Sequence, residues 1–272
     1  MQPSLSDLVS SFDEAAETYD SVGVDFFSPI GRALVLHAAI RPGEHVLDVG
    51  CGRGAVLLPA AAAAGPAGRV VGTDLAPAMV ALTSAAAEAA NLGNVEMAIG
   101  DAQAPDYAPA SFDVITAGLV LFFLREPQAA VQAYRTLLRP GGRLAFSSFA
   151  RNDPHFGAAL HALAGHSPVP APRGRTPDLF AAQDTVRSAL TNNGYRDVDI
   201  REFSVRSEFR DFDHWLQWAW SHGARQLLRT IPDARLGAAA ADAEEALTDA
   251  RTGNGRQIVL ATTARTVIAT RR

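Results

Sequence analysis

A short apolar run that ends in a glycine-rich turn constrains the fold of this chain more than any other stretch. Residues 46–49 read Val-Leu-Asp-Val, glycine follows at positions 50, 52 and 54, and an alanine-rich segment begins at Ala55. This pattern is typical of a buried parallel strand, a tight turn and the start of a helix. Glycine is favoured where the backbone turns sharply or a ligand approaches closely. The N–H groups at the helix start favour a polar or anionic ligand.

Predicted strands and helices alternate around this turn. The strands are expected at residues 45–50, 69–73, 95–99, 111–116 and 143–149. Helices are expected between them, at 54–64, 77–91, 119–124 and 127–138. Such alternation predicts βαβ units, and therefore a mainly parallel sheet with right-handed crossovers.

The two flanks of this region are predicted to be mostly helical. Residues 5–40 show the spacing of two amphipathic helices. The elements expected in the C-terminal half are a helix near 177–193, a strand at about 197–207, two helices within 211–250 and a strand-like run at 257–270. Because the two helices lie between predicted strands, we expect residues 208–255 to form an inserted lid.

The composition excludes several classes of protein. The chain has 272 residues, of which 48% are hydrophobic, and its formal net charge is −5. No basic excess is available for phosphates, so we expect neither a nucleic-acid partner nor a membrane partner. The sequence contains no lysine, which excludes a Schiff-base lysine and a phosphate-loop lysine. The single cysteine, Cys51, and the absence of a signal-peptide pattern predict a reduced, cytoplasmic protein.

On spacing alone, the glycine turn has two interpretations. Residues 50–55 satisfy the dinucleotide pattern G-x-G-x-x-G/A, with Asp74 near the distance expected for a ribose-binding acid. However, Asp48 precedes the turn and Asp101 follows the third predicted strand, so three acids are expected at one edge of the sheet. Carboxylates repel a pyrophosphate, whereas a cationic nucleoside would stabilise them. The acids therefore favour a cationic ligand without phosphates.

Five sequence blocks resemble those of one enzyme family. The blocks are V-L-D-V-G-C-G-R-G (46–54), G-T-D-L-A-P-A-M (72–79), G-D-A (100–102), S-F-D-V-I (111–115) and L-R-P-G-G-R-L (138–144). In this order and spacing they resemble the class I S-adenosylmethionine-dependent methyltransferases. The segment F-D-E-A-A-E-T-Y-D (12–20) is similar to the small-molecule branch of that family.

The resemblance implies an α/β fold and a division of the chain. The expected core is a Rossmann-like, doubly wound, seven-stranded mixed sheet in the order 3-2-1-4-5-7-6, with an antiparallel last strand and helices on both faces. The expected parts are an N-terminal helical cap (1–40), the core (41–207), a helical lid over the acceptor site (208–255) and the final strand (256–272).

The resemblance also implies which residues bind the cofactor, S-adenosyl-L-methionine. The residues expected around its methionine part are Asp48, Gly50, Gly52, Gly54 and Ala117, the last through a nearby carbonyl. Those expected around its ribose and adenine are Asp74, Leu75, Asp101 and Ala102, with Tyr19 closing over the cofactor. The alternatives are a strand-end turn residue for Asp48, a helix cap for Asp74 and an ordinary core residue for Tyr19.

The general base is where this chain departs from the family. Many members carry a histidine pair after the fourth strand, whereas this chain carries Phe122 and Phe123, which predict an apolar acceptor pocket. Two candidates remain, His155 after the fifth strand and His222 in the predicted lid, because histidine has a suitable pKa. The alternatives are a solvated loop histidine for His155 and a structural hydrogen bond for His222. No metal site is expected from the histidine spacing.

The tryptophans of the predicted lid also have two interpretations. Trp215 and Trp218 are three residues apart and share a helix face, which either packs the lid or forms a wall of an aromatic acceptor site. We expect a small-molecule O-methyltransferase of secondary metabolism, as a monomer or homodimer. The alternatives on the same fold are a C- or N-methyltransferase and a cyclase-like enzyme. A nicotinamide-dependent oxidoreductase is the alternative outside the family.

Overall fold

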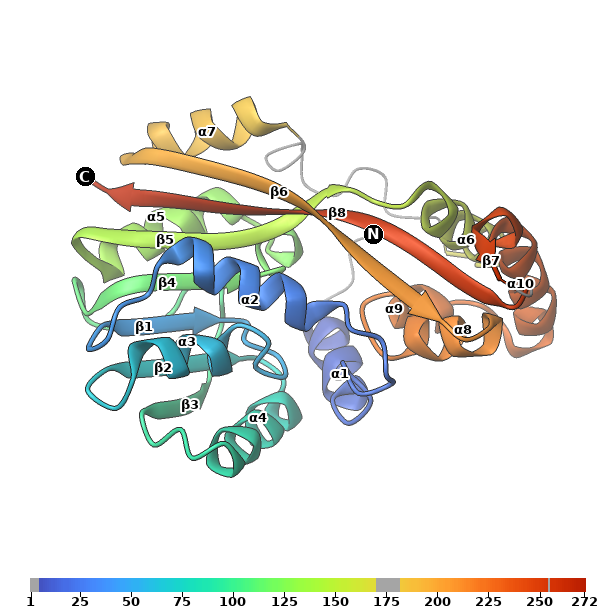
Figure 1. Ribbon diagram of the computed structural model, residues 1–272, viewed down its shortest axis with the longest axis horizontal. Coiled ribbons are helices and arrows are strands. Elements are labelled where there is room, and N and C mark those ends of the chain that lie inside the picture. Colours follow the sequence, from blue (N-terminus) through green and yellow to red (C-terminus); the bar gives the residue numbers. More distant parts are fainter. Residues whose placement is uncertain (1–4, 170–181, 254) are drawn as a thin grey trace. The chain divides into compact units, whose positions relative to one another are not determined.

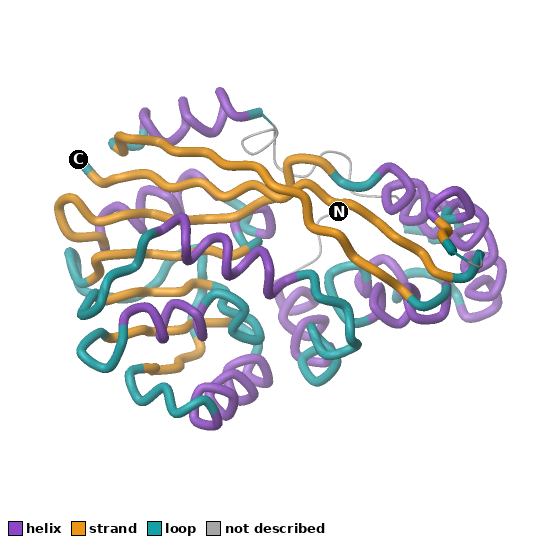
Figure 2. Tube along the Cα trace, viewed as in Figure 1, coloured by secondary structure: helices purple, strands orange, loops and turns teal. Residues whose placement is uncertain are grey.

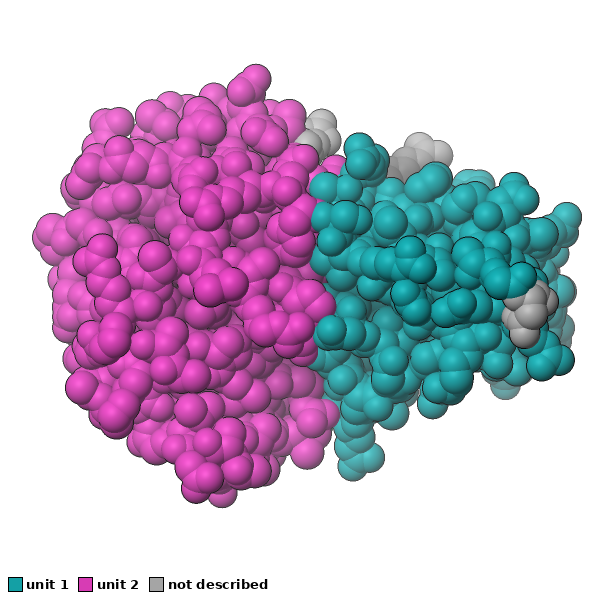
Figure 3. Space-filling view, viewed as in Figure 1, with its two compact units in different colours: residues 1–26, 151–175, 204–263 teal, residues 27–150, 176–203, 264–272 magenta. Residues whose placement is uncertain are grey.

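The computed structural model describes residues 5–169, 182–253 and 255–272. The chain divides into two compact units, which Figure 3 distinguishes by colour. Unit 1 comprises residues 1–26, 151–175 and 204–263, and unit 2 comprises residues 27–150, 176–203 and 264–272. Among the described residues, no helix is long and apolar enough to cross a membrane.

The strands of the chain form one mixed sheet in the order β3-β2-β1-β4-β5-β8-β6 (Figure 1). Their bounds are β1 His45–Val49, β2 Arg69–Asp74, β3 Val95–Ile99, β4 Phe112–Gly118, β5 Leu138–Arg151, β6 Tyr195–Phe209 and β8 Gln257–Arg271. The pairs within β1–β5 are parallel, and the arrow of β8 points opposite to that of β6 in Figure 1. The short β7 (Arg251–Thr252) only pairs with β8. The predicted strand order is therefore confirmed.

Helices cover both faces of the sheet in unit 2 (Figure 2). Their bounds are α2 Phe27–Ala38, α3 Leu57–Ala64, α4 Pro77–Ala89, α5 Pro127–Leu137 and α7 Gln183–Asn192, with the 3-10 turn η1 at Leu121–Phe123. Alternate strand residues point to opposite faces, so Val46 packs with α2 and α3 while Leu47 packs with α5 and α7. The predicted start of the helix at 177 lies outside the described residues.

Unit 1 is built around helices and the remaining parts of β6 and β8. Its helices are α1 Leu5–Ala15, α6 Pro154–Gly165, α8 Phe212–Trp220, α9 Arg225–Leu228 and α10 Asp233–Ala246, with η2 at Thr248–Ala250. The segment 211–250 therefore contains three α-helices where two were predicted, because a turn at residues 221–224 separates α8 from α9. α2, which was expected in the N-terminal cap, belongs to unit 2.

The helix α6 was not predicted, because prolines and histidines interrupt the periodicity of its sequence. Asp153 is its N-cap, with Pro154 in the first turn. The buried Asp153 carboxylate accepts hydrogen bonds from the N–H groups of His155 (2.9 Å) and Ala261 (2.7 Å). The second partner is distant in sequence, so tertiary contacts stabilise this helix start. His155 consequently lies on α6, and its expected loop position is wrong.

Candidate cofactor-binding site

The glycine turn between β1 and α3 adopts a backbone conformation that other residues rarely adopt. Gly50, Gly52 and Gly54 have φ values of +61°, +50° and +83°. Residues 52–56 form turns and a bend, and α3 begins only at Leu57, three residues later than predicted. Positive φ is incompatible with a right-handed helix, which explains the later start.

The three glycines differ in what a side chain would meet. A Cβ at Gly50 would lie 2.5 Å from a methyl group of Val120, and one at Gly54 would lie 3.0 Å from both Leu58 and Thr83. A Cβ at Gly52 would meet no atom within 4 Å. The first and third glycines are thus required by protein packing, whereas Gly52 faces open space that a ligand can enter.

Hydrogen bonds from neighbouring elements hold the turn in place. The Cys51 N–H donates to the Thr73 carbonyl (2.9 Å), and the Thr83 hydroxyl donates to the Gly52 carbonyl (2.6 Å). From the other side, α2 packs so closely that a Cβ at Gly31 would lie 2.0 Å from the Ala55 carbonyl oxygen. The turn is therefore preorganised by β2, α4 and α2.

Asp48 is a buried carboxylate inside the sheet. It is 1% exposed and pairs in register with Gly72 on β2 and Thr116 on β4. Its Oδ1 accepts a hydrogen bond from the Thr116 hydroxyl (2.7 Å), and its buried Oδ2 has no hydrogen-bond partner among the described residues. Asp48 is thus a strand residue, and the alternative of a turn residue is wrong.

The environment of Asp48 favours its neutral form in the free protein. Burial raises the pKa of Asp48 to about 7 and the charge of Asp74 adds to this, while the Thr116 hydroxyl and the Leu57 N–H oppose it. A cationic ligand beside Oδ2 would favour the ionised carboxylate and supply its missing partner. This orphaned oxygen therefore fits a ligand that carries positive charge.

Asp74 connects the end of β2 to the glycine turn. Its Oδ2 accepts the Gly52 N–H and its Oδ1 accepts the Ala76 N–H, each at 2.9 Å. The N-cap position of α4 is Ala76, which makes no side-chain cap. Asp74 is therefore not the N-cap of this helix, although it accepts the N–H of the N-cap residue. Each carboxylate oxygen of Asp74 thus accepts one backbone N–H.

Asp101 and Ala102 follow β3 next to the end of β2. β2 and β3 pair Asp74 with Ile99, and the Gly100 N–H donates to the Asp74 carbonyl (3.0 Å). Asp101 accepts the Gln103 N–H (2.8 Å), and the buried Ala102 carbonyl accepts the Tyr134 hydroxyl. Leu75 is half-buried beside Asp74. The three predicted acids thus lie at the carboxyl ends of adjacent strands.

Three hydroxyl side chains at this edge were not predicted. Thr116 binds Asp48, while the buried hydroxyls of Thr73 on β2 and Ser148 on β5 have no hydrogen-bond partner among the described residues. The only signal in the sequence is a polar residue near the end of an apolar strand. Ala117 is fully buried within β4, one residue before that strand ends.

The remaining predicted residues, Tyr19, His155 and His222, belong to unit 1, whereas the cofactor residues above belong to unit 2. Tyr19 is half-buried after the end of α1, with its ring 6.2 Å from Phe12. His155 is half-buried in the first turn of α6.

His222 has the geometry of a hydrogen-bond donor. Its Nδ1 accepts the Ala224 N–H at 3.2 Å, so in the neutral ring the proton is assigned to Nε2. Burial lowers the pKa of His222 to about 3, which keeps the ring neutral near pH 7. A ring in this state is a weak base and can donate through Nε2.

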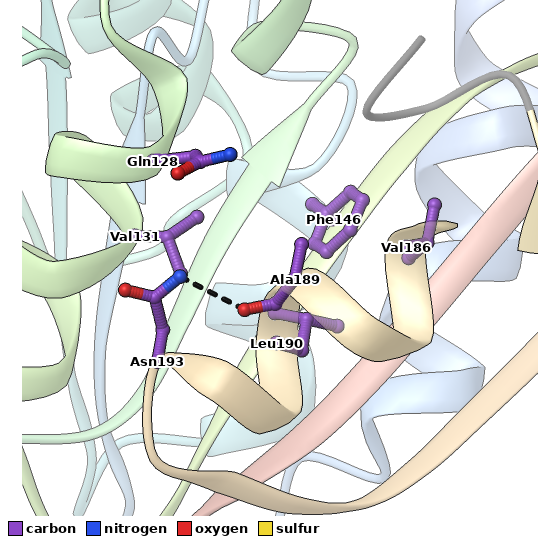
Figure 4. Close-up of a pocket in the computed structure, with 7 residues that line it drawn as sticks. All are labelled: Gln128, Val131, Phe146, Val186, Ala189, Leu190 and Asn193. Carbon is purple, nitrogen blue, oxygen red and sulfur yellow. Dashed lines mark hydrogen bonds between the residues drawn. The ribbon is translucent and has the colours of Figure 1, made fainter. Parts of the chain in front are cut away.

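A shallow apolar hollow lies between α5 and α7 of unit 2 (Figure 4). It is lined by Gln128, Val131, Phe146, Val186, Ala189, Leu190 and Asn193. None of the lining residues is titratable. The side-chain amide of Asn193 donates a hydrogen bond to the Ala189 carbonyl (2.8 Å). We interpret the hollow as a seam between two helices.

Comparison with known proteins points to one kind of enzyme. Residues 46–142 match the family model of a methyltransferase domain. Nocamycin O-methyltransferase from Saccharothrix syringae is 37% identical over 254 residues, which covers 87% of this chain and 89% of that protein. Aklanonic acid methyltransferase DauC from a Streptomyces species is 40% identical over 141 residues, which covers 52% of this chain and 64% of that protein.

Among solved structures, YcgJ from Bacillus subtilis has the same fold. It covers 90% of this chain and 98% of its own, with a TM-score of 0.60 and 18% sequence identity.

Proposed function

Because this chain belongs to the class I S-adenosylmethionine-dependent methyltransferases, we propose that it methylates an oxygen atom of a small molecule in secondary metabolism. The similarity to nocamycin O-methyltransferase over most of both chains supports this acceptor class. The similarity to aklanonic acid methyltransferase over half of the chain supports it further. Membership of this family rules out the alternative of a nicotinamide-dependent oxidoreductase.

The residues of unit 2 fit the cofactor. The orphaned Oδ2 of Asp48 suits its cationic methionine end, and the open space at Gly52 allows the ligand to approach the backbone. A carboxylate such as Asp74 at the end of β2 suits the two ribose hydroxyls because it has two acceptor oxygens, and Asp101 and Ala102 follow the next strand, where the adenine edge is expected. This match of an orphaned carboxylate with a cationic cofactor is the observation that carries the proposal.

The contribution of the chain to catalysis is mostly binding and alignment. S-adenosylmethionine supplies a methyl group on a positively charged sulfur. Methyl transfer is an in-line displacement, which gains most from holding the two reactants in a fixed geometry. The preorganised glycine turn provides such a fixed support, and Asp48 stabilises positive charge beside it.

An apolar surface near the ends of β4 and β5 supports a small-molecule acceptor that is largely hydrophobic. Phe122 and Phe123 of η1 lie with ring centroids 4.7 Å apart, and Phe149 lies 5.6 Å from Phe122. None of these rings can remove a proton. They can exclude water from the acceptor and pack against its apolar part.

Replacing Asp74 tests the cofactor site directly. Asp74→Asn removes the charge and part of the acceptor capacity, so the affinity for S-adenosylmethionine should fall about tenfold in calorimetric titration. Asp106→Asn, at an exposed position of the same unit, is the matched control and should bind as the wild type does. Equal affinities for the two variants would remove Asp74 from the site.

The product identifies the acceptor atom. S-adenosylmethionine with a ¹³C-labelled methyl group should yield an O-methyl resonance after incubation with small-molecule extracts of the source organism. A labelled C-methyl or N-methyl product would contradict the proposed oxygen acceptor.

A further inference from the structure

Both polar backbone groups of Gly52 are bound by side chains of unit 2. The Gly52 N–H donates to Oδ2 of Asp74 at the end of β2 (2.9 Å). The Gly52 carbonyl accepts the hydroxyl of Thr83 on α4 (2.6 Å). The Cys51 thiol also donates to this carbonyl, but its sulfur lies 3.9 Å away and a thiol is a weak donor. Thr83 is therefore the strong partner of the Gly52 carbonyl.

Thr83 is not explained by the helix in which it lies. The sequence of α4 is rich in alanine, and threonine forms helices less readily than alanine does. A helical threonine hydroxyl commonly bonds a carbonyl three or four residues earlier in its own helix. The fully buried Thr83 side chain instead donates to a carbonyl 31 residues away in the sequence. Its contact with the glycine turn therefore accounts for a threonine at this position.

The two branches of the Thr83 side chain face two different glycines. The hydroxyl binds the Gly52 carbonyl. The methyl carbon lies where a Cβ on Gly54 would approach it to 3.0 Å. One branch thus fixes a polar group of the turn and the other packs against it, so that a substitution can remove either branch alone.

We propose that Thr83 is a positioning residue for recognition of the cofactor ribose, and that it acts through Gly52 on Asp74. This inference rests on the proposed function, in which Asp74 receives the ribose hydroxyls. The contacts run from the Thr83 hydroxyl to the Gly52 carbonyl, and from the Gly52 N–H to the Asp74 carboxylate. Glycine has a wide range of backbone conformations, so a Gly52 held at one end only can rotate. Such a rotation would remove the N–H from Oδ2 of Asp74.

The orientation of the Asp74 carboxylate depends on this contact. Its Oδ1 accepts the Ala76 N–H and its Oδ2 accepts the Gly52 N–H, so the two oxygens are fixed by two backbone groups. Without the second contact the carboxylate can turn about the first. Because hydrogen bonds are directional, a turned carboxylate binds ribose hydroxyls less well. Thr83 is fully buried, and it acts by fixing the turn and not by contacting the ligand.

Two ligands that differ only in the ribose test this proposal on the full chain. We would titrate S-adenosylhomocysteine and its 2′-deoxy derivative by calorimetry. The wild type should bind the first about tenfold more tightly, since the second lacks one hydrogen bond to a carboxylate. Equal affinities of the wild type for the two ligands would overturn the proposal, because Asp74 would then not recognise this hydroxyl.

Thr83→Val removes the hydroxyl and keeps nearly the same side-chain shape. Its affinity for S-adenosylhomocysteine should fall about tenfold, and its preference for this ligand over the 2′-deoxy derivative should fall to about threefold or less. A general loss of stability would weaken the binding of both ligands alike and leave the preference unchanged. An unchanged preference in Thr83→Val would therefore overturn the proposal.

A conservative variant and a matched control locate the effect in the hydroxyl of Thr83. Thr83→Ser keeps the hydroxyl and should keep the preference of the wild type, although the lost methyl group should lower its thermal denaturation temperature. Thr191→Val is the control, because the Thr191 hydroxyl donates to the Arg187 carbonyl of its own helix, α7 (2.9 Å). It should bind both ligands as the wild type does. A reduced preference in either variant would contradict the assignment.

Thr83→Cys decides the matter if Thr83→Val does not fold. Cysteine resembles serine in size, but its thiol is a weaker donor than a hydroxyl, so the preference should be smaller in Thr83→Cys than in Thr83→Ser. Equal preferences in these two variants would exclude a role for the hydroxyl. The wild-type titration reports separately on the proposed function. Failure to bind S-adenosylhomocysteine at millimolar concentration would reject that function, whereas binding without an effect of Thr83 would reject only the positioning role.

Discussion

At the scale of single residues, the acids and glycines around the β1–α3 turn have separate tasks. Asp48 has one buried oxygen without a partner, while both oxygens of Asp74 hold backbone N–H groups. Gly50 and Gly54 are required by neighbouring side chains, and only Gly52 faces open space. The site therefore separates structural contacts from those available to a ligand.

The burial of Asp48 predicts a conflict between stability and binding. Its folded-state pKa of about 7 lies above the value of 3.8 for an exposed aspartate. The raised pKa means that Asp48 binds its proton more tightly in the folded state than in the unfolded state. The contribution of this proton to the free energy of unfolding is therefore lost as the pH rises from about 4 through 7. The full loss above pH 7 is at most about 4 kcal/mol, before relaxation and partial solvation reduce it.

Asp48→Asn should therefore stabilise the ligand-free protein at pH 8 and weaken S-adenosylmethionine binding. The stabilisation arises because the amide cannot ionise, and the loss of affinity because it carries no charge. Urea denaturation at pH 5 and pH 8 should show a larger gain in unfolding free energy at pH 8. A variant less stable than wild type at pH 8 would contradict the buried-carboxylate interpretation.

The open position at Gly52 gives a second test at this scale. Gly52→Ala places a methyl group where no protein atom lies within 4 Å, although its φ of +50° is costly for alanine. Gly54→Ala has similar backbone strain and also brings its methyl 3.0 Å from Leu58 and Thr83. We expect Gly54→Ala to have the lower thermal denaturation temperature of the two variants. We expect Gly52→Ala to show the larger loss of cofactor affinity in proportion to its loss of stability. The reverse order would place the ligand elsewhere.

At the scale of elements, the contact between α2 and the glycine turn fixes the geometry of the site. Gly31 lies on α2 where the backbone of Ala55 passes so closely that a Cβ would lie 2.0 Å from its carbonyl oxygen. Gly31→Ala must therefore displace the helix or the turn, with a predicted loss of about 3 kcal/mol in unfolding free energy.

Gly157→Ala is the matched control for this prediction. Gly157 also lies within a helix, α6, but a Cβ there would meet no atom within 4 Å. Alanine should stabilise this helix by about 0.5–1 kcal/mol, measured by urea denaturation. Similar effects of the two substitutions would show that the helix α2 does not constrain the turn.

The same scale explains how much of the structure could be predicted from the sequence. The strands of the core were predictable because their apolar runs are continuous and separated by glycine and proline turns. The helix α6 was not, because its start depends on Asp153 binding a backbone group more than a hundred residues away in the sequence. Asp48 and Asp74 were predictable from their place at strand ends, whereas the Thr116 hydroxyl gains its role only from pairing between β1 and β4.

At the scale of the whole molecule, the two units carry different chemistry. Unit 2 contains the acids and the glycine turn, which suit a cationic nucleoside. Unit 1 contains the aromatic side chains of α8, including Trp215 and Trp218, whose buried indole N–H groups have no hydrogen-bond partner among the described residues. The predicted lid (208–255) falls within unit 1, and its role as a lid stays a prediction.

The affinity of the wild type for S-adenosylmethionine at pH 6 and at pH 8 tests the central claim most directly. Since the ionised Asp48 binds the cation and its pKa is about 7 in the free protein, the ionised fraction, and with it the affinity, should rise about tenfold between these two values. Asp48→Asn should lose most of this pH dependence. Equal dissociation constants for the wild type at pH 6 and pH 8 would contradict the claim that a buried carboxylate receives the cationic cofactor.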